Sequence, residues 1–248
     1  MLAEPGPDEP SPDEPGPAEL VEVSEAERRS VRQRRAALRG HASELAWPAS
    51  LGVIPAEQCR PAVTAVVWAE PGRVPGLLAD LAAQTYPELE ILLAGPVAGE
   101  VRSAVEAWPR PVAVVAAGSL AEAVARARGT LVTVFDQHAR YGPEHVWDLV
   151  LARMYSGAAI VGRGREFSIV EGRLRRRPLL ITEAYTGRVA PQAMLVSRGD
   201  LEDLGGWSAR LCRAARDRGQ AVYRTHPFGL VQVEDSATDP REWTGAFA

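Results

Sequence analysis

The sequence has no lysine, few cysteines and no long apolar run, and these absences exclude several classes of protein. Its two cysteines, Cys59 and Cys212, are too few for a disulfide framework and do not have the spacing of metal ligands. No apolar stretch approaches the roughly 20 residues that span a bilayer. The chain starts with acidic residues and prolines, whereas a signal peptide starts with basic residues and an apolar stretch. We therefore expect a cytoplasmic protein without a transmembrane segment.

The charge balance argues against polyanionic partners. The 248 residues carry a formal net charge of −4, and the pI is about 5.7. Such a protein has no strong attraction to nucleic acid or to acidic membranes. Because 46% of the residues are hydrophobic, the chain can bury one substantial core. We expect one main domain and no nucleic-acid partner.

The first 60 residues differ in composition from the rest. Residues 1–27 contain nine acidic residues and no basic one, so residues 1–18 are predicted to be a disordered acidic, proline-rich tail. Residues 19–60 are predicted to form a helical extension, which carries a cluster of arginines. These are Arg28, Arg29, Arg32, Arg34, Arg35 and Arg39. The cluster fits an RNA or membrane contact, or an amphipathic helix lying on the domain. The second reading is favoured because no aromatic residues interleave the arginines.

From Pro61 the pattern changes to short apolar runs that alternate with helical segments. Strands are predicted at residues 63–68, 89–94, 111–116 and 130–135, and helices at 73–84, 100–108 and 119–128. Buried runs of this length that alternate with helices are typical of a parallel sheet covered on both faces. The first half is therefore predicted to be a Rossmann-like α/β layer.

The second half continues with mixed elements. A helix is predicted to begin at Pro143, because proline is favoured in the first turn of a helix. Further strands are predicted at residues 158–161, 166–170, 192–197, 221–223 and 229–233, and helices at 199–204 and 209–218. Residues 172–191 look irregular and basic. We expect the main domain to cover residues 61–235 and a loose tail to cover 236–248.

Four segments, in this order, resemble motifs of bacterial family 2 glycosyltransferases, in particular those of actinobacteria. Residues 81–90, with Gln84, Thr85, Tyr86 and Pro87, resemble the turn "S-L-x-x-Q-T-Y-P-x-x-E". Residues 121–136 resemble the segment that ends in the acidic "D-x-D" motif, and residues 140–145 resemble the segment that follows it. Residues 194–207 resemble the acceptor-side motif "R-x-x-L-x-x-x-G-G-[FW]". The resemblance covers about residues 61–233.

The resemblance implies a GT-A fold and transfer of a sugar from a nucleotide-diphosphate donor to an unknown acceptor, with inversion and with Mn²⁺ or Mg²⁺. In such a fold the acidic motif lies at the carboxyl edge of the sheet, where open α/β sheets bind ligands. The nucleotide-sugar residues implied here are Trp68, Glu70, Asp136 and Gln137. The implied metal ligands are Asp136, His138 and His226, since carboxylate and imidazole groups both ligate Mn²⁺. The alternative is a loop with a solvated His138 and with His226 bonded to the backbone.

The acceptor side is implied by Gly205, Gly206 and Trp207. The two glycines let the backbone approach an acceptor, or only make a tight turn. Trp207 stacks on a sugar, or belongs to the core. The arginines of residues 173–177 grip a diphosphate, or lie on a solvated hairpin.

Other positions depart from the family pattern and put catalysis in doubt. The segment 93–96 ends the second strand without the carboxylate that binds the base, and Trp68 leads into Ala69 and Glu70 instead of the usual "P-x-x-N" loop. After Trp207 no carboxylate stands in the position of the catalytic base. Glu183 is a substitute base only if its loop faces the site. The alternative to an enzyme is a silent GT-A domain that binds a nucleotide sugar or a protein. A dinucleotide-binding enzyme is not favoured, since no G-x-G-x-x-G follows the first strand.

Overall fold

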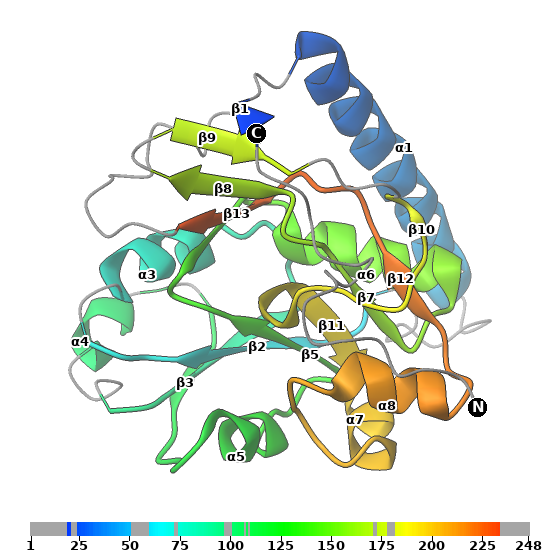
Figure 1. Cartoon of the computed structure of the whole chain (residues 1–248). Coiled ribbons are helices and arrows are strands. Elements are labelled where there is room, and N and C mark those ends of the chain that lie inside the picture. The colour runs from blue at the N-terminus through cyan, green and yellow to red at the C-terminus, as the bar shows by residue number, and fades with distance from the viewer. Residues whose placement is uncertain are drawn as a thin grey trace, which may run out of the picture.

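The computed structural model describes residues 19–20, 24–50, 60–71, 74–96, 101–106, 108, 110–170, 173–177 and 182–233. These residues form a mixed α/β structure with a mostly parallel central sheet and a second, smaller sheet beside it (Figure 1). The predicted α/β class is confirmed. The predicted tails, residues 1–18 and 236–248, lie outside the described residues.

The central sheet has the strand order β10-β12-β7-β11-β5-β2-β3-β4. Its strands are β2 (Val63–Trp68), β3 (Leu89–Ala94), β4 (Val112–Val114), β5 (Leu131–Phe135), β7 (Ile160–Gly162), β10 (Ala184–Tyr185), β11 (Met194–Ser197) and β12 (Val222–Arg224). Strands β5, β2, β3 and β4 are parallel neighbours, and β11 is antiparallel to both β5 and β7. The carboxyl ends of β2, β3, β4 and β5 therefore meet at one edge of the sheet.

Helices cover both faces of this sheet because its strands are apolar on both sides. The helices of the domain are α3 (Val74–Ala82), α4 (Arg102–Val105), α5 (Leu120–Ala125), α6 (His145–Ser156), α7 (Arg198–Asp203) and α8 (Leu211–Asp217). Residues of α3, α4 and α6 belong to one hydrophobic cluster, and residues of α5, α7 and α8 belong to the other. The N-terminus of α5 is capped as predicted, since the Ser119 hydroxyl accepts a hydrogen bond from Glu122 N.

One strand of the second sheet follows the acidic motif directly. Its order is β1-β9-β8-β13-β6. The strands are β1 (Glu19–Leu20), β6 (Ala139–Tyr141), β8 (Phe167–Val170), β9 (Arg173–Arg176) and β13 (Leu230–Val233). Strand β9 corrects the expectation that residues 172–191 are irregular, and β6 and β10 were not predicted. These three strands are short, and β9 is mostly charged, so their residues show no apolar run. Strand β9 forms a hairpin with β8, whereas β6 pairs with β13 and β10 pairs with β12, both far along the chain.

The N-terminal extension lies on the domain. Helix α1 (Glu25–Ser50) passes along α6 (Figure 1), and Val31 packs in a cluster with residues of the second sheet. Its arginines form ion pairs with the domain: Arg35 pairs with Asp148, and Arg39 with Glu144. This favours the amphipathic reading of the arginine cluster over a nucleic-acid contact. Within the described ranges, no helix has the length and apolar character needed to cross a membrane.

Candidate functional site

A cleft of about 560 Å³ opens at the carboxyl edge of the central sheet. Trp68 lines it from the end of β2, Gly95 and Pro96 from the end of β3, and residues 116–118 from the segment after β4. Glu122 of α5 completes the lining. Open α/β sheets bind ligands at this edge. Trp68 is half-buried, so part of its indole reaches the cleft.

The close approach of two strand ends explains why a glycine stands in this cleft. Gly95 has φ +101°, and a Cβ atom at this position would lie 2.7 Å from the Ala69 carbonyl oxygen. Ala69 N also donates to Ala94 O over 2.7 Å, which fixes the ends of β2 and β3 beside each other. Only glycine accommodates both the positive φ and the contact. The segment after β3, which carries no carboxylate, is therefore held by its backbone.

The acidic motif follows β5 and is fixed by its own backbone. Asp136 Oδ1 accepts a hydrogen bond from His138 N over 2.8 Å. Asp136 N donates to the Tyr141 hydroxyl over 2.7 Å, and that hydroxyl donates to Gln192 O over 3.1 Å. Tyr141 is buried, and burial raises its pKa well above the ordinary range, so the phenol stays protonated and can donate. The motif is thus anchored between β6 and the turn Pro191–Ala193 before β11.

Glu70 and Gln137 join the loop after β2 to the acidic motif. Glu70 N donates to Gln137 Oε1 over 3.3 Å, and Gln137 Nε2 donates to Glu70 Oε2 over 3.2 Å. Both residues were predicted to contact the nucleotide sugar. The structure brings them together with Asp136 at one edge of the sheet, next to the cleft that Trp68 lines.

The structure does not assemble Asp136, His138 and His226 into one metal site. Among the described residues, no three His, Cys, Asp or Glu side chains converge in a way that could hold an ion. His226 is 6% exposed, and its Nε2 lies 3.2 Å from Asp148 Oδ2. The expectation that His226 joins the motif is therefore corrected: a buried carboxylate on α6 holds its imidazole.

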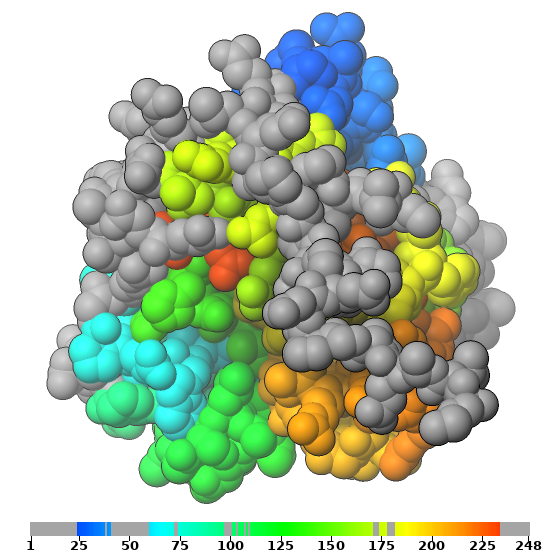
Figure 2. Space-filling model, viewed as in Figure 1, coloured from blue at the N-terminus to red at the C-terminus, as the bar shows by residue number. Residues whose placement is uncertain are grey.

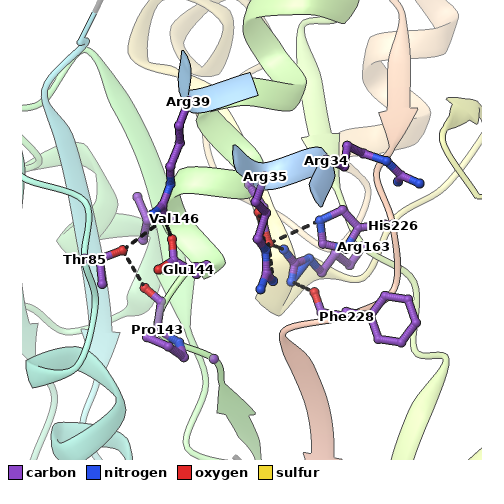
Figure 3. A network of polar contacts seen from close by, with 12 residues as sticks. Arg34, Arg35, Arg39, Thr85, Pro143, Glu144, Val146, Arg163, His226 and Phe228 are labelled. Carbon is purple, nitrogen blue, oxygen red and sulfur yellow. Dashed lines mark hydrogen bonds and ion pairs between the residues drawn. The ribbon is translucent and has the colours of Figure 1, made fainter. Parts of the chain in front are cut away.

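Asp148 is the centre of a buried network. Figure 3 shows four other members of this network, Arg35, Arg163, His226 and Phe228, close together. The Asp148 carboxylate accepts from Arg35 Nε over 3.0 Å and from Arg163 Nη2 over 2.6 Å, besides its contact with His226. Arg163 is fully buried and also donates to Phe228 O. Burial opposes ionisation of Asp148, but the three neighbouring basic groups outweigh it and hold its pKa well below the usual range. The network joins α1, α6 and the ends of β7 and β12.

Two buried polar residues hold the segment that follows the motif: Gln84, which belongs to the Q-T-Y-P turn, and Asp80, which the sequence analysis did not identify. Asp80 accepts from Arg140 Nε over 2.7 Å and from Tyr141 N over 2.9 Å. Gln84 donates to Gly142 O over 2.9 Å and accepts from Val146 N over 3.2 Å. Asp80 and Asp148 do not follow the apolar spacing of their predicted helices, which is 74, 77, 78 and 81 in one and 146, 149 and 150 in the other. Their burial, which requires bonded partners, is visible only in the structure.

The glycine pair of the acceptor-side motif ends a helix. Gly206 N donates to Leu201 O over 2.7 Å and Gly205 N to Glu202 O over 3.3 Å, which is the Schellman pattern after α7. Both glycines have positive φ, and a Cβ atom at either would meet nothing within 4 Å. Trp207 is 8% exposed and packs in the cluster of α7 and α8. The tight-turn and core readings therefore account for these three residues, and their acceptor-side role is not needed to explain them.

Glu183, considered above as a substitute base, and Asp200, which precedes the Gly-Gly-Trp motif, both have other partners. Glu183 forms an ion pair with Arg34 of α1. Asp200 accepts from Ser197 Oγ over 2.5 Å and from Arg153 Nη2 over 2.9 Å. Ser197 pairs with Leu131, the first residue of β5, so Asp200 follows the end of β11 that lies at the opposite edge of the sheet from the motif. Neither acid is placed to serve the motif in this conformation.

Comparison with known proteins supports the fold. No protein-family model and no curated protein matches the sequence. The structure of S. aureus TarS 1-349 in complex with UDP-GlcNAc matches with a TM-score of 0.57 and 13% identity, over 70% of this chain and 59% of that one. The complex of TarS 1-349 with UDP matches with a TM-score of 0.54 and 13% identity, over 75% and 63% of the two chains. TarS is a GT-A family 2 glycosyltransferase, so the predicted GT-A fold is confirmed. This chain spans less than two thirds of the length of those structures.

Proposed function

We propose that this chain binds a nucleotide-diphosphate sugar at the cleft beside Asp136 and transfers the sugar, with inversion, to an acceptor. The observation that carries the proposal is the meeting of the Trp68 cleft and the acidic motif at one sheet edge, joined by the Glu70–Gln137 pair. Trp68 provides an aromatic surface for a base, and the ends of β3 and β4 provide backbone groups. The fold shared with TarS, whose structures hold UDP-GlcNAc or UDP, supports this reading.

Asp136 and His138 are the residues that would hold Mn²⁺ or Mg²⁺. Asp136 Oδ1 is used by His138 N, which leaves its second oxygen for a cation, and His138 is exposed. Two protein ligands fit this chemistry, because Mg²⁺ is commonly bound by one or two carboxylates and completed by substrate phosphates and water. A divalent cation there neutralises the charge of the leaving diphosphate.

A second candidate function is a silent GT-A domain that binds the nucleotide sugar without transferring it. One observation favours it. Trp207 leads into residues 208–210 and α8, which provide no carboxylate in the place of a base. Losing a general base costs about 10²–10⁴-fold in rate. The two functions share the donor site and differ in turnover of the donor.

The test is a thermal-shift panel with UDP, GDP and dTDP, each with and without Mn²⁺. A ligand at about 100 times its dissociation constant adds about 2.7 kcal/mol to the free energy of unfolding. We expect a metal-dependent shift with one nucleotide and its loss in Asp136→Asn, which keeps an oxygen for His138 N. Asp217→Asn is the matched control, since its side chain is 68% exposed on α8. No shift with any nucleotide contradicts both functions. A shift without release of nucleoside diphosphate from the sugar donor, across a panel of acceptors, selects the silent domain.

A further inference from the structure

The arginine side chains of β9 and of the residue after it lie on both faces of the second sheet. Because successive side chains of a strand point to opposite faces, Arg175 and Arg177 share one face, while Leu174 and Arg176 share the other. Arg176 pairs with Glu27 of α1 over 2.8 Å and lies over the Phe167 ring. We call the face of Arg176 the outer face and the face of Arg175 the inner face.

The inner face is directed toward the central sheet. Gln232, on this face, accepts from Gln192 Nε2 over 3.4 Å, and Gln192 lies in the turn Pro191–Ala193 that leads into β11. Ala139 and Leu230 also belong to the inner face and to the main hydrophobic cluster of the central sheet. The outer face instead packs with Val31 of α1. Arg175 is therefore on the same side of its sheet as the candidate site.

Strand register places Arg175 in line with the acidic motif. Ala139 pairs with Gln232, Gln232 with Ser168, and Ser168 with Arg175. These four residues form one row across the inner face, which begins at the residue after His138. Three strand spacings separate the ends of the row, or about 14 Å. Ala139 and Ser168 are buried, whereas Gln232 and Arg175 are partly exposed, so a ligand that extends from the motif can meet this row at Gln232 and at Arg175.

The row contains polar groups with unused bonding capacity. Ser168 is 3% exposed, and within the described part of the chain neither Ser168 Oγ nor Arg175 Nε has a hydrogen-bond partner. Glu166 lies opposite Arg177, whose backbone N donates to Glu166 O over 2.7 Å. Arg175 lies opposite Ser168, which carries no charge. Arg175 is partly exposed, and lime-coloured atoms of this part of the chain reach the molecular surface in Figure 2.

We propose that Arg175 binds an oxyanion, a phosphate or a carboxylate, carried by the acceptor about three strand spacings from the motif. The inference rests on the proposed function for its acceptor role. A guanidinium group binds both oxyanions through paired N–H donors, and Ser168 Oγ adds a donor on the same row. Arg175 would therefore bind an acceptor that carries a negative group at this distance more tightly than a neutral sugar.

The test measures binding of glucose 6-phosphate, glucuronate and glucose to the full chain by calorimetry, without nucleotide. Either anionic sugar is expected to bind at least tenfold more tightly than glucose. Arg175→Gln is expected to weaken that binding about tenfold, since a hydrogen bond to a charged group is lost. Arg176→Gln, on the outer face of the same strand, is the matched control and keeps the affinity. If Arg175→Gln does not fold, Arg175→Lys keeps the charge and loses the paired donors, and is expected to weaken binding several-fold.

Three results overturn the inference. The first is that glucose binds as tightly as both anionic sugars, or that none of the three sugars binds measurably. The second is that Arg175→Gln and Arg176→Gln weaken binding equally, which assigns the effect to charge at long range. The third is that Arg175→Gln removes the shift produced by UDP and Mn²⁺, which places the residue at the donor. The binding assay contains no nucleotide. A negative result in it therefore contradicts the role of Arg175, whereas a negative thermal-shift panel contradicts the donor site.

Discussion

Arg35 and Asp148 are 113 residues apart in the sequence and form a two-point ion pair in the interior. Arg35 Nε lies 3.0 Å from Asp148 Oδ1, and Nη2 lies 2.8 Å from Oδ2. Their side chains are only 10% and 2% exposed. The pair attaches α1 to the domain, and the same carboxylate also contacts Arg163 and His226. The position of α1 and the charge balance of the core therefore depend on one aspartate.

Asp148→Asn is expected to destabilise the protein strongly. The substitution leaves Arg35 and Arg163 in the interior without a counter-ion, and breaking a buried pair in this way typically costs about 3–5 kcal/mol. Unfolding by urea measures the change. Arg32→Gln is the control, because it removes an exposed pair with Glu25 from the same helix. Equal, small effects of both variants contradict the central role of Asp148.

Stability is expected to fall as the pH drops below about 6.5, the ordinary pKa of histidine. Burial lowers the pKa of His145 well below that value, and burial also lowers the pKa of His226. Both imidazoles are neutral in the folded chain and take up protons first in the unfolded chain. Each contributes stability that is present above the unfolded pKa and is lost below it, at up to about 1.4 kcal/mol per pH unit. Glu166, whose pKa burial raises, offsets part of this loss.

The difference between wild type and His145→Gln isolates one of these groups. The free energy of unfolding is measured at several values between pH 5 and pH 8. In the variant, the free energy of unfolding is expected to fall less steeply on acidification, because about one proton fewer is taken up on unfolding. Parallel curves for the two proteins contradict the assignment, whatever their absolute stability.

Tyr141→Phe is expected to weaken metal-dependent nucleotide binding. The substitution removes the hydroxyl that accepts from Asp136 N and donates to Gln192 O. An unsatisfied buried group costs about 1–3 kcal/mol, and the motif loses one anchor. Tyr86→Phe is the control, because its hydroxyl donates to Pro61 O over 2.6 Å, at the start of β2. Only the first variant is expected to reduce the thermal shift with nucleotide and Mn²⁺.

Trp68→Ala is expected to weaken nucleotide binding through loss of an aromatic surface in the cleft. Loss of base–aromatic stacking costs about 1–3 kcal/mol. Nucleotide titrations of the variant at constant Mn²⁺ measure the affinity. Trp108→Leu is the matched control, since Trp108 lines a different pocket with Arg102 and Arg110. An unchanged affinity in Trp68→Ala contradicts binding of the nucleotide base in this cleft.

Gly206→Ala separates the two readings of the glycine pair. Gly206 has φ +90°, a conformation that costs other residues about 1–2 kcal/mol. A helix-cap role predicts lower thermal stability with unchanged nucleotide binding. Gly199→Ala, within α7 and without positive φ, is expected to leave stability unchanged or slightly higher. A loss of binding or turnover in Gly206→Ala without a loss of stability favours approach to an acceptor.

The α/β architecture was predictable because each central strand is an apolar run between helical segments. Strands β2 and β3 begin and end at the predicted residues. Strand β9 reads Arg-Leu-Arg-Arg and has no such signal; its pairing with β8 makes it a strand. The smaller sheet combines the β8–β9 hairpin with β1, β6 and β13 from three other parts of the chain, and the register between these parts depends on tertiary contacts.

The candidate site was predictable in part. Glu70, Asp136 and Gln137 do lie together, since they follow strands that end at the same edge of the sheet. His226 also follows a strand, but its partner Asp148 comes from α6, and sequence spacing gives no distance between the two. For Gly205 and Gly206 the sequence left two alternatives open, a tight turn or an approach of the backbone to an acceptor. The backbone hydrogen bonds in the structure identify a helix cap, and no sequence pattern could do so.

Strand β1 has a consequence for where this protein can be shortened. The backbone of Glu19 and Leu20 covers the outer edge of β9. Removal of the first 60 residues uncovers that edge, and unpaired strand edges are templates for aggregation. It also exposes the apolar surface under Val31 and takes Arg35 from Asp148. A shortened protein that begins at Pro61 contains every strand of the central sheet, yet it lacks the segment that keeps the smaller sheet from pairing with its own copies.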